Sequence, residues 1–169
     1  MRITELNIYP LKSARGISLA QSQITAEGLA GDRRAVLVDA SGHFITQREM
    51  QALATVSVVP EQGGLRISAE GKGEILAKPS DTRLDATVWK SVIDAAIATD
   101  EANETLSGWL GRDIKLVFFD EQSRRIANPE WAGDETPVTF SDGYQILVTT
   151  TASLAALNAD MAANGEDRV

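Results

Sequence analysis

Cysteine is absent from the 169 residues, which excludes disulfides and thiolate metal ligands within this chain. Histidine occurs once, at position 43, so neither a histidine-rich metal site nor a Ser–His–Asp triad is expected. The sequence also lacks the glycine-rich phosphate-binding motifs of dinucleotide-binding folds and of P-loop enzymes. It therefore contains no self-sufficient catalytic motif, and a function must rest on other residue types.

Long hydrophobic runs are missing as well. No apolar run approaches the roughly 18 residues that a membrane span requires. The first ten residues, MRITELNIYP, lack the apolar core of a signal peptide. We therefore expect a cytoplasmic location and no membrane partner. A hydrophobic content of 43% beside a charged content of 24% is typical of a globular protein that buries a core.

Positive charge is scarce overall but unevenly distributed. The net charge of −8 disfavours nucleic acid as a partner, because phosphate backbones attract basic surfaces. Residues 1–50 nevertheless carry a net charge of +1, whereas residues 51–169 carry −9. An anionic ligand is therefore expected to bind within the first fifty residues.

Apolar patterning predicts a strand-rich fold. Alternating or continuous apolar residues predict strands over residues 2–9, 17–25, 35–39, 54–60, 65–70, 83–98, 114–119 and 144–149. At 100–110 the period becomes helical, with Ala102, Leu106 and Leu110 on one face. A second helix is predicted at 151–163, after a threonine cap. The predicted fold class is α+β, with mostly antiparallel strands in a barrel-like sheet.

The stretch DEQSRRIANPEWAGDETP, at 120–137, is predicted to be a loop or linker. It mixes charges with proline and glycine and has no hydrophobic period. Loops of this length are uncommon inside a compact domain and often connect domains. We therefore expect a β-rich domain at 1–120, a linker at 121–137 and the start of a further domain at 138–169.

Three short basic segments lie within the first fifty residues: KSARG at 12–16, GDRR at 31–34 and TQR at 46–48. Arginine pairs bidentately with phosphate, lysine contributes a point charge, and a serine hydroxyl with turn N–H groups completes an anion site. A fourth candidate turn is FSDGY at 140–144. Any one such segment alone is more typical of a solvated turn, so the residues leave both an anion site and plain polar hairpin ends open.

The order of these motifs resembles a known family. YPLKSARGI, then GLAGDRRAVLVDASGHFITQRE, then a strand-rich stretch and FSDGYQILVTTTASLAALN resemble the N-terminal portion of MOSC-domain proteins. These are molybdenum-cofactor proteins that include the mitochondrial amidoxime-reducing component and its bacterial relatives. The resemblance implies that Lys12, Ser13 and Arg33 contact the phosphate-bearing pterin cofactor.

The resemblance extends to the later turn and to a further cation. It implies that Asp142, Gly143 and Tyr144 line the same cofactor pocket, and it makes Arg48 a weaker candidate for the site, for substrate binding or for packing. The metal-binding cysteine of the family lies in a C-terminal barrel and has no counterpart here. We therefore expect this chain to be the N-terminal β-rich domain plus the start of the MOSC domain, inactive alone and without a stably bound cofactor. The rest of the MOSC domain in the same polypeptide is the expected partner, together with an electron-transfer partner.

Three hypotheses for function stay open at this point. The first is that the longer protein is a molybdenum-cofactor enzyme, a reductase of N-hydroxylated or N-oxide substrates or a sulfur-handling enzyme. Pyridoxal-phosphate-linked sulfur transfer is a variant of this hypothesis. The second is a non-catalytic β-domain that binds an anionic ligand or a partner protein. The third is a purely structural role, in which the basic turns are solvated hairpin ends.

Overall fold

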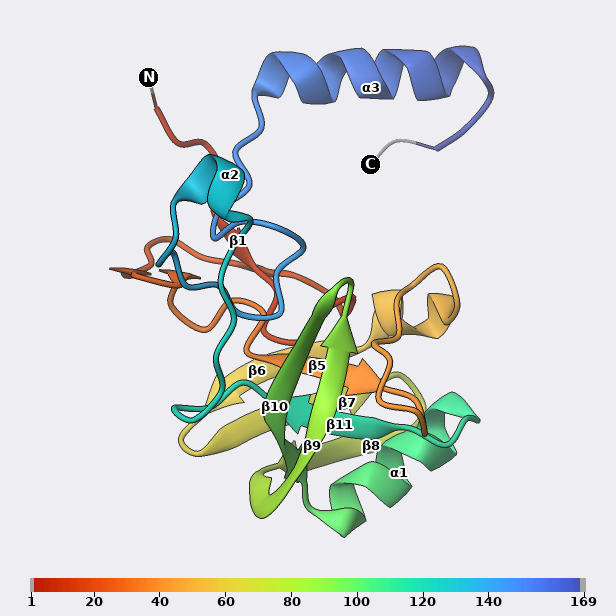
Figure 1. Cartoon of the computed structure of the whole chain (residues 1–169). Helices are drawn as coiled ribbons and strands as arrows, with labels where there is room; N and C mark the ends of the chain where they lie inside the picture. The colour runs from red at the N-terminus through yellow and green to blue at the C-terminus, as the bar shows by residue number, and fades with distance from the viewer. Residues whose placement is uncertain (1, 168–169) are drawn as a thin grey trace.

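The centre of the fold is a four-stranded antiparallel sheet (Figure 1). The computed structural model describes residues 2–167, and within them the sheet has the strand order β5, β11, β10, β9. These strands span Ala35–Val38 (β5), Pro79–Val88 (β9), Ser91–Ala98 (β10) and Lys115–Phe118 (β11). β9 and β10 form a long hairpin whose paired ends, Val88 and Ser91, are connected by Trp89 and Lys90 alone.

A second sheet of three strands shares a core with the first. It contains β6 (Ser57–Glu61), β7 (Gly64–Ala69) and β8 (Gly73–Ala77), which pair in sequence order. A short 3₁₀ helix, η1 (Gln51–Thr55), precedes it. Two pairs of very short strands complete the sheets: β1 (Asn7–Ile8) with β2 (Ile17–Ser18), and β3 (Ile24–Thr25) with β4 (Gly28–Leu29).

Both faces of the central sheet are buried at β5, as its continuous apolar sequence predicts. Successive side chains of a strand point to opposite faces. Ala35 and Leu37 join the core shared with β6, β7, β8 and the first helix, whereas Val36 and Val38 join a second core on the other face. Phe140 is fully buried in this second core. A segment distant in sequence therefore covers the sheet.

The helix predicted at 100–110 is confirmed as α1 (Asp100–Leu110). Its predicted apolar face packs inward: Ala102 and Leu106 are buried, and Leu110 is partly buried against the same core. The helix ends at Gly111, whose φ of 67° is left-handed and suits a residue without a Cβ atom. In Figure 1, α1 lies beside β8 and β11.

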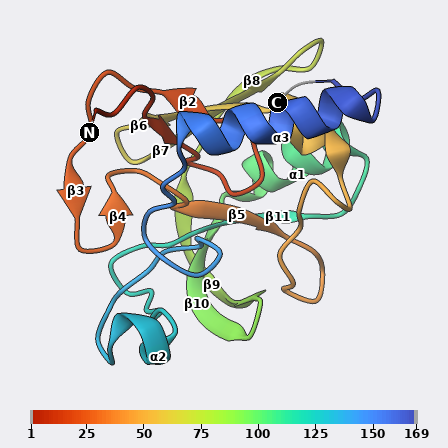
Figure 2. The ribbon, with the colours of Figure 1, turned by 90° about the horizontal axis from the view of Figure 1, so that it is seen from above.

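The second predicted helix is also confirmed, as α3 (Thr151–Ala163). It begins with a capping box: the Thr150 hydroxyl accepts from the Ser153 N–H at 3.0 Å, and the Ser153 hydroxyl accepts from the Thr150 N–H at 3.1 Å. Its apolar side chains are not covered, since Leu154 and Leu157 are 40% and 49% exposed. Figure 1 shows α3 outside the strands, at the end of the molecule opposite α1, and Figure 2, seen from above, shows α3 in front of the strands.

Two predictions of the fold need correction. The antiparallel pairing is confirmed, but none of the four sheets within residues 2–167 closes into a barrel. The strand predicted at 144–149 is wrong, because this segment pairs with no described strand and Leu147 and Val148 remain about 80% exposed. An apolar composition favours extended backbone, but a strand also needs a neighbour to satisfy its N–H and C=O groups.

The region predicted as a linker is mostly irregular, with one short helix, α2 (Pro129–Ala132). The structure places residues 138–140 against the central sheet rather than apart from it. The division into domains around 121–137 stays a prediction. In the part of the chain described, no helix is both long and apolar enough to cross a membrane.

Candidate functional site

The three basic turns meet in one cleft of about 330 Å³. We call it the cationic cleft and define it by its lining residues: Tyr9, Lys12, Ser13, Ala14, Arg33, Thr46, Gln47, Arg48, Trp89 and Asp142. Five of the seven site residues predicted from the sequence therefore lie together. The other two, Gly143 and Tyr144, follow Asp142 in the chain but do not line the cleft, so their role stays a prediction.

The first turn is fixed by apolar side chains on both sides of its polar residues. Leu11 and Ala14 are buried in the core, and the Lys12 N–H donates to the Ala35 carbonyl of β5 at 2.8 Å. Since its neighbours are anchored inward, the backbone at Lys12 and Ser13 is held at the mouth of the cleft. Ser13 has a φ of 67°, a left-handed conformation unusual for a serine.

The second turn runs alongside the first. The Arg33 N–H donates to the Tyr9 carbonyl at 2.9 Å, and the Arg33 guanidinium lies 4.5 Å from the centre of the Tyr9 ring. Asp32 is buried, pairs with the guanidinium of Arg33 and accepts the Tyr9 N–H at 2.7 Å. Arg33 is thus oriented by an aromatic face and a carboxylate.

The third turn contributes a cation with no internal counter-charge. The Gln47 amide donates to the Ser13 carbonyl at 2.8 Å and ties this turn to the first. Arg48 is exposed, and no carboxylate of residues 2–167 forms an ion pair with it. A cation that is unpaired within the protein favours binding of an anion from solution.

Lys12 and Asp142 form the pair at the centre of the cleft. The Lys12 ammonium donates to Oδ1 of Asp142 at 2.7 Å, and the Trp89 indole N–H donates to the same oxygen at 3.1 Å. Burial lowers the pKa of Lys12, although the hydrogen bond and charge of Asp142 oppose this. Burial would raise the pKa of Asp142, but the hydrogen bond and charge of Lys12 outweigh it, so this pKa is lowered.

Arg125 positions the segment that carries Asp142. Its guanidinium donates to the carbonyls of Thr139, Ser141 and Asp142, at 2.8 Å for Thr139 and 3.2 Å for Asp142. The Ser141 hydroxyl is buried and has no hydrogen-bond partner among the described residues, which leaves one polar group unsatisfied beside the cleft. Arg125 was not predicted, because an arginine in an irregular loop of mixed charge has no distinguishing sequence signal.

Backbone strain is concentrated in the cationic cleft. Among the described residues, three that are not glycine have a positive φ: Ser13, Arg33 and Trp89. All three line the cleft. Such conformations are unfavourable for L-residues and cluster at ligand sites in proteins, because the surrounding structure must hold them in place.

The residues that the sequence analysis missed are mainly aromatic or uncharged. Tyr9, Trp89, Thr46 and Gln47 all line the cleft. Tyr9 and Gln47 stand inside quoted motifs, YPLKS and TQR, and adjacency to the cations could have identified them. Trp89 carried no such signal, because the sequence predicted one continuous strand over residues 83–98. The structure instead places Trp89 in the two-residue connection of a hairpin, where glycine or asparagine is usual.

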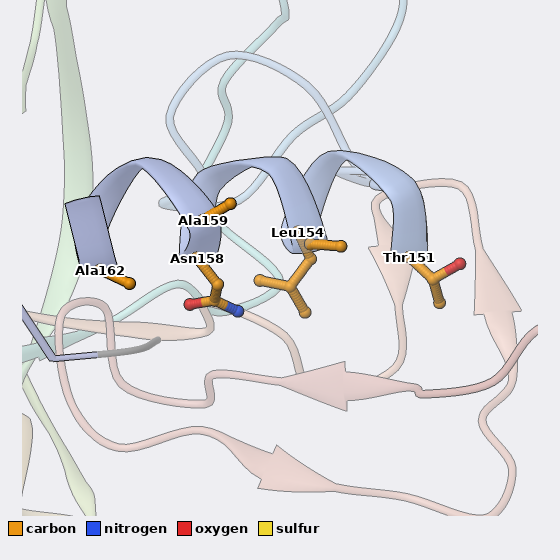
Figure 3. A pocket seen from close by; sticks show the side chains of 6 residues that line it. Thr151, Leu154, Asn158, Ala159 and Ala162 are labelled. Carbon is orange, nitrogen blue, oxygen red and sulfur yellow. The ribbon is translucent and has the colours of Figure 1, made fainter.

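A second groove, of about 440 Å³, runs along α3 (Figure 3). Figure 3 shows Leu154, Asn158 and Ala162 along it. Its six lining residues, which all belong to α3, include no charged side chain. The groove therefore lacks the chemistry of an anion site. No cluster of three potential metal ligands occurs within the described residues either.

Comparisons with known proteins identify the same family that the sequence motifs resemble. A family model described as the MOSC N-terminal beta barrel domain matches residues 1–113. Mitochondrial amidoxime reducing component 2 of Bos taurus is 29% identical over 171 residues, which cover 94% of this chain and 51% of that protein. Mitochondrial amidoxime-reducing component 1 of Mus musculus is 26% identical, covering 92% and 49%.

More distant similarities exist to other proteins. Molybdenum cofactor sulfurase of Drosophila grimshawi is 25% identical over 92% of this chain and 21% of that protein. The structural match to a solution structure of a Bordetella bronchiseptica protein covers 66% of this chain and 97% of the Bordetella chain, with 17% sequence identity and a TM-score of 0.49. The chain spans about half the length of the amidoxime-reducing components that it matches.

Proposed function

The chain belongs to the MOSC N-terminal beta barrel domain family, and from this premise we propose that the cationic cleft binds the phosphate-bearing end of a molybdenum cofactor. The observation that carries the proposal is the convergence of Lys12, Ser13, Arg33 and Arg48 in one cleft. They come from three turns that are separate in the sequence. Relatives named as amidoxime reducing components and as a molybdenum cofactor sulfurase support the choice of cofactor.

The residues of the cleft suit a phosphate monoester. Lys12 provides a buried ammonium, Arg33 and Arg48 provide guanidinium groups, and Ser13 provides a hydroxyl on a strained turn. Charge-assisted hydrogen bonds of this kind are about twice as strong as neutral ones. The donors therefore fit the phosphate, whereas this chain, without cysteine, offers no thiolate for a metal.

Each residue then has a distinct role in binding. Lys12 and Arg33 neutralise the phosphate, because both are held in position by the protein before a ligand enters. Arg48 attracts the anion from solution. Asp142 is the internal carboxylate that already pairs with Lys12, so the phosphate must either displace Asp142 or bind Lys12 beside it. When bound, the cofactor supplies the redox or sulfur chemistry of its metal.

For the whole protein we propose a molybdenum-cofactor enzyme that reduces N-hydroxylated or N-oxide substrates or handles sulfur. The same proposal includes a cofactor-binding role for Gly143 and Tyr144. It also includes the remaining MOSC domain and an electron donor as partners, and a cytoplasmic location. Metal and pterin analysis of the full polypeptide tests it. We expect molybdenum and pterin in equal amounts. A full polypeptide that contains neither would contradict the proposal that it is a molybdenum-cofactor enzyme.

Calorimetric titration of this chain tests the anion site itself. Glycerol phosphate in phosphate-free buffer is the probe, and Lys12→Met combined with Arg33→Met is the variant. We expect the affinity to fall about a hundredfold or more, because the variant removes two cations and hydrogen bonds to charged groups contribute about 1.5–3 kcal/mol each. Lys72→Met with Lys115→Met removes the same charge from exposed positions and serves as the control.

The outcomes separate the hypotheses. If the Lys12/Arg33 variant and the Lys72/Lys115 control bind glycerol phosphate equally well, the claim that the cationic cleft is an anion site is contradicted. Binding of glycerol phosphate by this chain, together with a full polypeptide that contains no molybdenum, would favour the non-catalytic anion-binding domain. Preference for pyridoxal phosphate over a phosphorylated pterin would favour the sulfur-transfer variant.

A further inference from the structure

Trp89 occupies a position in the β9–β10 hairpin that favours glycine. Trp89 and Lys90 alone connect the paired residues Val88 and Ser91, and Trp89 has a φ of 55°. Two-residue hairpin connections use glycine, asparagine or aspartate at positions of positive φ, because a Cβ atom is unfavourable there. A bulky aromatic residue at this position therefore needs a compensating contact or a function.

The contacts of Trp89 engage two sides of its ring and leave about half of the residue exposed. The indole N–H donates to Oδ1 of Asp142 at 3.1 Å, and this oxygen also accepts from the Lys12 ammonium. On another side the ring meets Phe44 at 5.0 Å between centroids with an interplanar angle of 62°. Trp89 nevertheless remains 49% exposed. A half-exposed aromatic ring thus lies beside the buried cation of the cleft.

The second aromatic residue of the cleft is already covered. The Tyr9 ring faces the Arg33 guanidinium at 4.5 Å, and it lies so close to Gly16 that a Cβ atom there would be 2.8 Å from Cε1. Of the two aromatic rings that line the cationic cleft, Trp89 is therefore the more open to a ligand.

We propose that Trp89 determines the specificity of the cationic cleft for phosphate monoesters that carry a planar heteroaromatic ring. The phosphate is held by Lys12 and Arg33, and the ring packs against the open part of the indole. Aromatic side chains recognise planar rings through offset stacking. The inference rests on the proposed function, because it assumes that the cleft binds a phosphate, and it adds the part of the ligand that the cations do not recognise.

Calorimetry with two probes tests this inference. Glycerol phosphate has the phosphate without a ring, and a phosphomethyl-pterin has both. In the unsubstituted protein we expect the pterin to bind about tenfold more tightly, since stacking on an aromatic side chain contributes roughly 1–3 kcal/mol per base in nucleic-acid complexes. In Trp89→Leu the ratio of the two dissociation constants is expected to fall to about one. In Trp131→Leu, which changes an exposed residue of α2 outside the cleft, the ratio should not change.

A conservative variant separates stacking from support of the hairpin. Trp89→Tyr keeps an aromatic ring, so most of the preference for the pterin should remain. If the preference disappears equally in Trp89→Tyr and Trp89→Leu, or if Trp89→Leu weakens both probes by the same factor, Trp89 only supports the fold and the inference is overturned. If the unsubstituted protein binds glycerol phosphate but shows no preference for the ring, the inference fails while the anion site stands. If it binds neither probe, both fail.

Discussion

The Nζ atom of Lys12 and Oδ1 of Asp142 lie 2.7 Å apart although 130 positions separate them in the sequence. The ammonium side chain is only 7% exposed, whereas the carboxylate is 78% exposed. A buried charge is unfavourable unless it is paired. Asp142 therefore supplies from within the protein the negative charge that Lys12 requires, and an incoming phosphate must compete with it.

Replacement of this carboxylate should affect stability and binding in opposite directions. Asp142→Asn leaves Lys12 buried without a counter-charge, and we expect the free energy of unfolding to fall by about 1–3 kcal/mol. The affinity for glycerol phosphate should rise severalfold, because the competing charge is gone. Chemical denaturation and calorimetry measure the two effects. Asp134→Asn, at an exposed loop position, is the control, and a loss of affinity in Asp142→Asn would contradict the competition.

The same pair predicts a dependence of stability on pH. The pKa of Asp142 is lowered in the folded protein. A lowered carboxyl pKa stabilises the fold above the ordinary value of about 4, and this contribution is lost as the pH falls through the folded-state pKa. The difference in unfolding free energy between the unsubstituted protein and Asp142→Asn should therefore be largest near neutral pH and shrink below pH 4. A difference that is constant from pH 7 to pH 3 would show that the charge of Asp142 is not responsible.

Gly16 is predicted to control the orientation of Arg33 through Tyr9. In Gly16→Ala the new Cβ atom would lie 2.8 Å from Cε1 of Tyr9 and displace the ring. Because a ring at the end of a side chain can move, the stability should fall by only about 1 kcal/mol or less. The phosphate affinity should fall more noticeably, since Arg33 loses the ring that orients it. Gly108→Ala, where only the backbone of its own helix lies close to the new Cβ, is the control for binding. Its stability should rise by about 0.5–1 kcal/mol, because alanine is more favourable than glycine inside a helix.

Ser13 allows strain and hydrogen bonding to be separated. Its φ is 67°, so Ser13→Gly should relieve strain and raise the free energy of unfolding by up to about 1 kcal/mol relative to Ser13→Ala. Both variants lack the hydroxyl, and both should weaken phosphate binding to a similar degree. Thermal denaturation and calorimetry give the two comparisons. If the phosphate affinity is unchanged in both variants, the Ser13 hydroxyl does not contribute to phosphate binding.

The sequence predicted the helices better than it predicted the sheets. Both helices have local signals, a 3.6-residue apolar period or a threonine cap, and these were sufficient to place α1 and α3. The segment 144–149 has the composition of a strand, but strand formation depends on a partner that local sequence does not specify. The same dependence explains why four separate sheets were not distinguished from one barrel-like sheet.

Lys12, Ser13, Arg33 and Arg48 could be chosen as candidates because charged and hydroxyl side chains beside turns are visible in the sequence. Their convergence depends on backbone contacts between distant segments, such as the Arg33 N–H with the Tyr9 carbonyl, and composition cannot reveal these. Trp89 was missed because its role follows from a positive φ, which becomes visible only in the structure.

The most direct test of the central claim is an NMR titration of the chain with inorganic phosphate at low salt, followed through the backbone amides and the tryptophan indoles. We predict saturable shifts that are confined to residues 12–14, 33–35, 46–48 and 142 and to the indole N–H of Trp89, all at or next to the cationic cleft. Shifts that are absent from these residues, or that occur instead along α3, would contradict the claim that this cleft binds a phosphate.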